Sequence, residues 1–184
     1  MTTLRPTYAV EIAGLIRNLP LFEVAPGLRI AVLNILGDTE LVQACARVLA
    51  GKLARFQYDI LVTPEAKSIP LAHALSMETK KPYIVLRKAY KPYMGAALSA
   101  ETLSITTGQP QSLYIDEKDQ TILKGKRAIV LDDVISTGST LNGMRLLMEK
   151  AGAQVVGEVA ICTEGDQSDW ANVIALAHLP LFKS

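Results

Sequence analysis

The sequence contains few of the residues that build metal clusters or disulfide frameworks. Among its 184 residues are two cysteines and two histidines. Cys45 and Cys162 lie in separate apolar stretches, and neither His73 nor His178 has a partner at the spacing of metal ligands. These absences argue against structural zinc and against a disulfide-stapled secreted domain. We expect a reduced, cytoplasmic chain in which both thiols are buried and inert.

The sequence also lacks an excess of either charge and any long apolar run. Lysine and arginine total 19 and aspartate and glutamate total 18, so the net charge of +1 predicts no general surface for a polyanion. No apolar run reaches the roughly 18 residues that cross a bilayer, and the opening MTTLRPTYAVEI lacks the architecture of a signal peptide. We therefore expect neither a nucleic-acid partner nor a membrane partner, and any anion site must be local.

Strand-like and helix-like segments alternate along the chain, which we interpret as one domain of residues 1–184. Short apolar runs typical of strands buried on both faces occupy residues 59–63, 83–87, 128–131 and 155–161. Apolar residues at helical spacing occupy residues 39–53, 69–77 and 140–151. This alternation predicts an α/β fold with a mostly parallel sheet flanked by helices.

One connection is far longer than such folds usually need. About forty residues separate the second and third predicted strands, and residues 88–125 form the long excursion between them. Within it, LSAETLSITTGQPQSLYID reads as two strands around a turn at residues 107–110. We therefore expect a β-hairpin lid rising over the edge of the sheet. Residues 88–95 mix basic and aromatic side chains, as single-stranded nucleic-acid sites do, but the net charge favours the base of the lid.

The segment AIVLDDVISTGST, residues 128–140, carries the strongest chemical signal. Ligands of an open α/β sheet bind at the carboxyl ends of its strands, where this segment turns from strand to helix. Backbone amides at a helix N-terminus, with a glycine for close approach, form a phosphate cradle. Asp132 and Asp133 would repel phosphate, so they should face vicinal hydroxyls, a metal ion or both. A phosphorylated sugar satisfies both demands.

Other interpretations explain less of this segment. The spacing of a Walker A loop and that of a dinucleotide fingerprint are both missing. A receiver-like signalling domain could use Asp132 and Asp133 with magnesium, but it needs no phosphate cradle directly after the pair. An ordinary helix-capping turn would explain the acidic pair by itself, without the apolar run before it or the STGST after it.

At these residues the sequence resembles the type I phosphoribosyltransferases, which bind phosphoribosyl pyrophosphate through an aliphatic strand, two acidic residues and a Thr-Gly-rich loop. The resemblance implies that Asp132 and Asp133 contact the ribose hydroxyls. It also implies the fold of that family, with the hairpin as a lid and residues 1–38 as a small N-terminal hood over the base. The residues that it assigns to the 5′-phosphate are Ser136, Thr137, Gly138, Ser139 and Thr140.

Two further motifs point to the purine branch of that family. TPEAKSIPLAHAL is similar to the family's pyrophosphate-binding loop. VLRK matches the Arg-Lys pair that adenine phosphoribosyltransferases and their archaeal hypoxanthine/guanine relatives carry at the end of the next strand. The residues that these two matches assign to the diphosphate are Glu65, Ala66, Lys67, Ser68, Arg87 and Lys88.

The lid and the hood match the family less closely. The mobile loop of the adenine enzymes carries a catalytic glutamate, and Glu101 is the residue that this chain offers. In the hood, the position of the base-binding segment is occupied by Leu28, Arg29 and Ile30. The resemblance therefore implies a catalytic role for Glu101 and a base-binding role for the hood segment.

The implied activity is transfer of the phosphoribosyl group to a purine base, adenine first, in purine salvage; hypoxanthine, guanine and xanthine remain alternatives. Magnesium would be held mainly through the substrate, with Asp132 and Asp133 contributing indirectly while they stabilise a cationic ribose. Lys67, Arg87 and Lys88 would offset the charge of departing pyrophosphate. Family members are commonly homodimers. A non-catalytic regulator that senses phosphoribosyl pyrophosphate is the second class, although only about 35 residues precede the first clear helix, too few for a winged helix.

Overall fold

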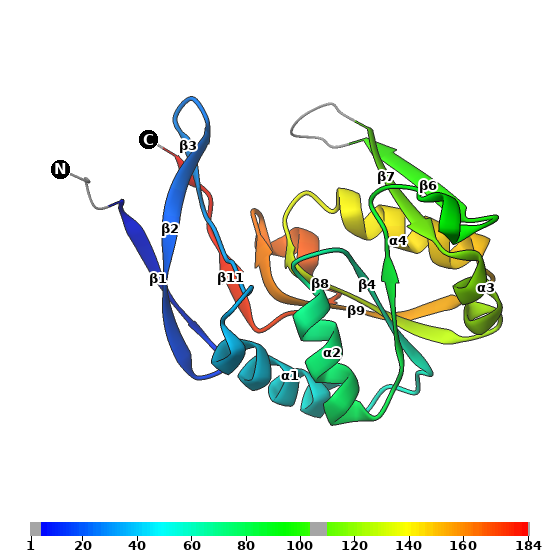
Figure 1. The fold of residues 1–184 in the computed structure, drawn as a ribbon. Coiled ribbons are helices and arrows are strands. Elements are labelled where there is room, and N and C mark those ends of the chain that lie inside the picture. Colours follow the sequence, from blue (N-terminus) through cyan, green and yellow to red (C-terminus); the bar gives the residue numbers. More distant parts are fainter. Residues whose placement is uncertain (1–4, 104–109, 184) are drawn as a thin grey trace.

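A computed structural model describes residues 5–103 and 110–183 and places a parallel sheet at the centre of the molecule (Figure 1). Its strands follow the order β10-β9-β8-β4-β5, with β11 also paired to β9, and every neighbouring pair is parallel. The α/β fold with a mostly parallel sheet is therefore confirmed. The strand bounds are β4 Ile60–Pro64, β5 Tyr83–Leu86, β8 Arg127–Ile135, β9 Gln154–Glu164, β10 Val173–Ile174 and β11 Ala177–Leu179.

Both faces of this sheet are buried, which explains why its strands read as unbroken apolar runs. Along β8, Ile129 and Leu131 pack in the cluster formed with helices α1 (Thr39–Leu53) and α2 (Ile69–Thr79). The alternate residues Ala128 and Val130 pack in a second cluster with helix α4 (Ser139–Lys150). Within the described residues, no helix is long and apolar enough to cross a membrane.

The prediction that the third strand ends at residue 131 is wrong. Strand β8 continues to Ile135, so Asp132 and Asp133 lie within the strand, and Asp132 pairs with Ala160 of β9. The apolar pattern stops at Leu131, but β9 runs alongside as far as Glu164 and supplies backbone partners for the polar residues. The predicted helix at residues 39–53 coincides with α1, and the other predicted helices and strands of the core differ from the observed ones by one to three residues at their ends.

The hood is a separate antiparallel sheet of four strands in the order β1-β2-β3-β12 (Figure 1). Its fourth strand comes from the C-terminal segment, where Phe182 pairs with Arg29 and packs its ring 5.2 Å from that of Tyr8. Residues 1–38 alone therefore do not make up the hood. The strand bounds are β1 Thr7–Ile12, β2 Leu15–Ala25, β3 Leu28–Ala31 and β12 Phe182–Lys183.

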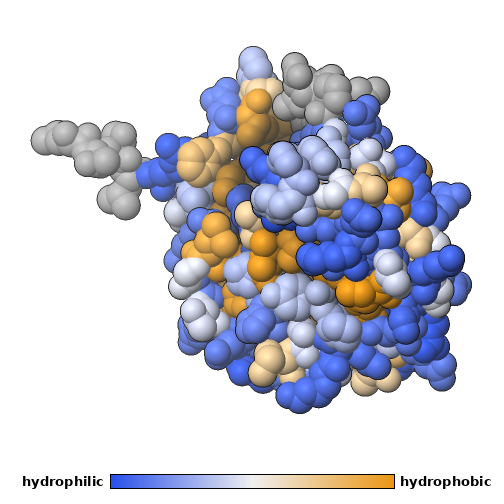
Figure 2. All heavy atoms as spheres, turned by 45° about the vertical axis from the view of Figure 1, so that its right-hand side comes forward, coloured by the Kyte–Doolittle hydropathy of each residue, from blue (hydrophilic) through white to orange (hydrophobic). Residues whose placement is uncertain are grey.

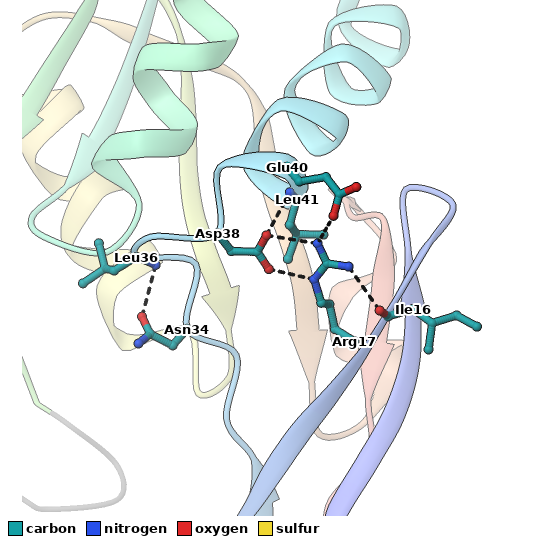
Figure 3. A network of polar contacts seen from close by, with 7 residues as sticks. All are labelled: Ile16, Arg17, Asn34, Leu36, Asp38, Glu40 and Leu41. Atoms are coloured by element: carbon teal, nitrogen blue, oxygen red, sulfur yellow. Dashed lines mark hydrogen bonds and ion pairs between the residues drawn. The ribbon is translucent and has the colours of Figure 1, made fainter.

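An ion-pair network joins the hood to the first helix (Figure 3). Arg17 of β2 donates from Nε to Asp38 Oδ2 over 2.7 Å and from a terminal nitrogen to Glu40 Oε2 over 2.8 Å. Asp38 is also the N-cap of α1, because its Oδ1 accepts from the Leu41 amide. The Arg17 guanidinium lowers the pKa of Asp38, so the charged carboxylate holds the strand and the helix end together.

The predicted hairpin is present and packs on α4 through its two strands, β6 (Leu98–Leu103) and β7 (Pro110–Ile115). Its predicted turn at residues 107–110 lies outside the described residues except where Pro110 begins β7. Ala100, Leu113 and Ile115 are buried, and a Cβ at Gly143 of α4 would lie 3.1 Å from Leu113 Cδ1. The absence of a side chain at Gly143 thus permits close contact between helix and hairpin.

The described residues of the long connection 88–125 that lie outside the hairpin are also structured. They contain a 3-10 turn, η1 (Pro92–Met94), and a short helix, α3 (Glu117–Leu123). Backbone hydrogen bonds of 3.0 and 2.8 Å between Arg87 and Tyr114 connect β7 to the end of β5. The described part of the predicted lid is therefore continuous with the core, and closure over a ligand stays a prediction.

The two cysteines are free and buried, as expected. Burial raises the pKa of each thiol to about 12. Because the thiolate is the reactive form, neither Cys45 nor Cys162 is suited to nucleophilic chemistry.

Replacing Leu113 by Ala should destabilise the whole domain, because the hairpin belongs to the second core cluster. We expect the free energy of unfolding to fall by about 2–5 kcal/mol, the usual cost of truncating a buried leucine. Urea denaturation measures this change. Ser99→Ala, at an exposed position of the same hairpin, is the matched control. An unchanged midpoint for Leu113→Ala would show that the hairpin unfolds independently of the core.

Candidate functional site

Most residues that the sequence assigns to the site lie at one edge of the central sheet, at or just after the ends of its strands. Because β4, β5, β8 and β9 are parallel, their carboxyl ends meet at that edge. The hood and the hairpin rise on opposite sides of it (Figure 1). The segments that follow the four strands therefore face a common space.

The segment after β8 has the geometry of a phosphate cradle. Gly138 has φ 75° and ψ 0° and is the N-cap of α4, so the loop turns in the left-handed region that favours glycine. Its amides stand at the N-terminus of a 12-residue helix, where anions are stabilised. Ser139 begins the helix, is buried and donates to Thr102 Oγ1 of the hairpin over 3.2 Å. This loop, residues 136–140, is called the phosphate loop below.

Trp170, the single tryptophan of the chain, lies against the phosphate loop. It ends the 3-10 turn η2 (Gln167–Trp170), and its indole Nε1 donates to the Glu164 carbonyl over 2.8 Å. A Cβ at Gly138 would lie only 3.0 Å from the Trp170 ring. The ring thus leaves no room for a side chain at residue 138, a proximity that sequence reasoning missed because nothing local links residues 138 and 170.

The acidic pair lies half-buried on β8 beside the phosphate loop. Asp132 Oδ1 accepts from the Asp133 amide over 2.9 Å. Burial and the neighbouring Asp133 carboxylate raise the pKa of Asp132, although the charge of Lys88 acts in the opposite direction. Neither carboxylate caps α4, whose N-cap is Gly138, so the capping interpretation of this pair is wrong.

The pair suits magnesium held largely by a ligand. Within the described residues, no group of three or more His, Cys, Asp or Glu side chains could hold a metal ion. Magnesium commonly takes one or two carboxylates and completes its shell with phosphate oxygens and water. Asp132 and Asp133 fit that role, as direct ligands or through water, when a phosphorylated ligand supplies the remaining oxygens.

Glu65 positions Arg87. Its two carboxylate oxygens accept from Arg87 Nε and from the Lys88 amide, each over 2.6 Å. Burial opposes ionisation of Glu65, but the Lys88 amide and the Arg87 guanidinium outweigh it and lower the pKa. Both oxygens of the Glu65 carboxylate are thus occupied, and they fix the guanidinium of Arg87 through Nε.

The other residues predicted to bind the diphosphate differ in exposure to solvent. Ala66 and Lys67 are exposed, so the Lys67 ammonium can reach a ligand. Ser68 is buried: its hydroxyl donates to the Pro64 carbonyl over 2.8 Å and lies 2.8 Å from Thr63 Oγ1. Its side chain therefore holds the loop in place, and with only 1% of the residue exposed the hydroxyl is turned away from a ligand.

A cavity of about 520 Å³ lies between the hood and the phosphate loop. Leu28 and Ile30 line it, whereas Arg29 does not, because successive side chains of a strand point to opposite faces. Apolar side chains reach the surface between hydrophilic ones in the space-filling view (Figure 2). The lining residues that sequence reasoning missed are Val24, Gln111, Glu164, Gly165 and Leu181.

Glu101 lies exposed on β6, opposite Ser112 of β7. Its neighbour Thr102 makes the contact to the phosphate loop. Within the described residues, no hydrogen bond or ion pair connects Glu101 to the acidic pair. Its catalytic role stays a prediction.

Comparisons with known proteins agree on one family. The model of the phosphoribosyl transferase domain matches residues 32–173. An adenine phosphoribosyltransferase of Thermosipho africanus is 31% identical over 149 residues, which cover 80% of this chain and 84% of that protein. A hypoxanthine/guanine phosphoribosyltransferase of Methanococcus voltae is 38% identical over 108 residues, 59% of this chain but only 54% of that protein. The structure of an adenine phosphoribosyltransferase from Thermoanaerobacter pseudethanolicus superposes with a TM-score of 0.66 at 19% identity, covering 94% of this chain and 95% of that one.

Replacing Gly138 by Val should weaken binding of phosphoribosyl pyrophosphate at least ~10-fold, since one or two hydrogen bonds to a charged ligand would be lost. A Cβ there strains a left-handed residue and presses against Trp170. Gly125→Val is the matched control, because Gly125 has a similar φ of 73° and precedes the opposite end of β8. Calorimetric titration measures both affinities. Equal affinities in two folded variants would remove the phosphate loop from the binding site.

Proposed function

The chain belongs to the phosphoribosyltransferase family, in the purine branch of its type I enzymes, and from this premise we propose that it transfers the 5-phosphoribosyl group from phosphoribosyl pyrophosphate to adenine. The products are adenosine monophosphate and pyrophosphate. One observation carries this proposal: the acidic pair lies on β8 and the phosphate loop directly follows that strand, next to a cavity with an apolar wall. That arrangement offers adjacent places for ribose, 5′-phosphate and base.

The proposed reaction breaks the bond between the ribose anomeric carbon and pyrophosphate, forms a bond from that carbon to a purine nitrogen and releases the proton of that nitrogen. The phosphate loop holds the 5′-phosphate, and Asp132 and Asp133 orient the ribose hydroxyls and stabilise positive charge on the ring. Arg87, held by Glu65, faces the departing pyrophosphate with Lys67 and Lys88. Bound magnesium supplies charge neutralisation at the leaving group.

Two further roles complete the proposed site. Glu101 is assigned the catalytic role of the hairpin glutamate. Leu28 and Ile30 of β3 provide an apolar surface for the flat face of the base, while Arg29 contributes backbone only. The hairpin, which contacts the phosphate loop through Thr102, excludes water while the ribose is reactive.

Adenine is favoured over the oxopurines by the extent of the similarity. The match to the adenine enzyme covers 84% of that protein, whereas the match to the hypoxanthine/guanine enzyme covers 54% despite its higher identity. The hood contributes a wall of the cavity. A match that covers only part of the chain can leave the hood out, and it then says less about the base. We further propose a cytoplasmic homodimer, as is common in this family.

The proposal is tested by incubating the purified protein with phosphoribosyl pyrophosphate, magnesium and each of adenine, guanine, hypoxanthine and xanthine. We expect nucleotide and pyrophosphate to appear with adenine, and to disappear when magnesium is chelated. Conversion of oxopurines alone would contradict the choice of adenine. Binding of phosphoribosyl pyrophosphate without turnover of any base would indicate a non-catalytic regulator instead.

Asp132→Asn should lower the turnover number at least ~10-fold, because a charge that stabilises the cationic ribose is lost. The same substitution should raise thermal stability. Because the pKa of Asp132 is raised in the folded protein, this carboxyl group ionises at a lower pH in the unfolded chain than in the native state. The native state therefore becomes steadily less stable relative to the unfolded chain from about pH 4 upward. The gain in melting temperature should therefore be small at pH 5 and larger at pH 8.

Asp133→Asn, measured in the same way, separates catalysis from structure. It should also lower turnover while leaving affinity for ribose 5-phosphate within a few fold, since the phosphate loop is untouched. If both variants kept full turnover, the acidic pair would have no part in the reaction.

A further inference from the structure

Glu164 is the last residue of β9 and has a buried carboxylate in the wall of the cavity. Only 5% of the residue is exposed, which is unusual for a charged side chain without a cationic partner. Within the described residues, none of the ion pairs includes Glu164. Burial of such a group is costly unless hydrogen bonds compensate for the lost water.

Two contacts fix this residue. Ser136 of the phosphate loop donates its hydroxyl to Glu164 Oε1 over 2.5 Å, and Trp170 donates to the Glu164 backbone carbonyl. Among the described residues, no hydrogen bond is made to the second carboxylate oxygen, Oε2. One oxygen is therefore anchored, and the other is free to accept from a molecule in the cavity.

The remaining walls determine what that molecule must look like. Residues 136, 137, 139 and 140 of the phosphate loop form one side of the cavity, and Leu28, Ile30 and Leu181 present apolar side chains on the hood side. Next to the loop, the cavity therefore suits a flat ring that buries its face on the hood and turns a polar edge to the carboxylate. An ionised carboxylate only accepts hydrogen bonds. The edge that it faces must therefore carry an N–H donor, and an oxo oxygen at the same place would be repelled.

We propose that Glu164 is a specificity-determining residue, which selects a purine with an exocyclic amino group over the purine with an oxo group at the same position. This inference rests on the proposed function and adds to it the group that distinguishes adenine from hypoxanthine. The amino group of adenine donates to Oε2, whereas the oxo group of hypoxanthine leaves a buried carboxylate facing a second acceptor. Sites that hydrogen-bond one substituent reject its analogue strongly, because the buried polar groups are left unpaired.

Glu164→Gln tests the inference with little change in shape. The amide can donate as well as accept, so it can pair with either substituent. We expect the preference for adenine over hypoxanthine, measured as the ratio of kcat/KM values, to fall at least ~10-fold. Glu158→Gln is the matched control: it makes the same substitution on β9 at a residue that pairs with Arg145 outside the cavity, and it should leave the ratio unchanged.

Ser136→Ala removes the hydroxyl that anchors Glu164 and leaves the Glu164 carboxylate in place. This variant should raise the KM for phosphoribosyl pyrophosphate while keeping the preference for adenine within a few fold, because the negative charge remains. A loss of base preference in Ser136→Ala equal to that in Glu164→Gln would assign specificity to the loop and overturn the inference.

Binding of the two product nucleotides gives a readout that needs no turnover. Trp170 lies against the phosphate loop, so its fluorescence should report binding of adenosine and inosine monophosphates. The unaltered protein should bind the adenine nucleotide at least ~10-fold more tightly, and Glu164→Gln should remove that difference. Equal affinities in the unaltered protein would overturn the inference, even if Glu164→Gln did not fold. A clear preference without any turnover would instead leave the inference standing and contradict the proposed enzyme activity.

Discussion

The pairing of β8 with β9 beyond the apolar core is the interaction on which the site depends. The ladder continues past Leu131 to Ile135 on one strand and to Thr163 on the other. This extension carries the acidic pair, places the phosphate loop after it and brings Glu164 to the same edge. A ladder that ended with the apolar residues would leave these polar groups on separate loops without fixed spacing.

Two accessory sheets flank this edge and contribute walls of the cavity. The hood is held by the Arg17 network at α1 and is completed by a strand from the other end of the chain. The hairpin is held by burial of Leu113 against the bare backbone of Gly143. Since each sheet is fixed to a different helix, the width of the cavity follows from the packing of α1 and α4 on opposite faces of the central sheet.

The sequence predicts the central sheet because both of its faces are buried, which makes each strand a continuous apolar run. It predicts the phosphate loop because the acidic pair, the hydroxyl residues and Gly138 are neighbours in the chain. The strand β12, the support from Trp170 and the buried Glu164 were missed, since each depends on pairing between segments distant in sequence. Glu65 was assigned to the diphosphate, but only the folded loop shows its two oxygens bound by Arg87 and Lys88.

The support of the phosphate loop by Trp170 has an entropic consequence. A loop that lies against an indole ring and is held by the hydrogen bond from Ser136 to Glu164 would lose little freedom on binding an anion. Lys67 at the far end of the site is exposed, and immobilising such a side chain costs about 1.5–2 kcal/mol of rotamer entropy. Under the proposed function, the two ends of the ligand would therefore be bound in different ways. The sugar phosphate would meet a preorganised backbone, while the diphosphate would order the exposed side chains that bind it.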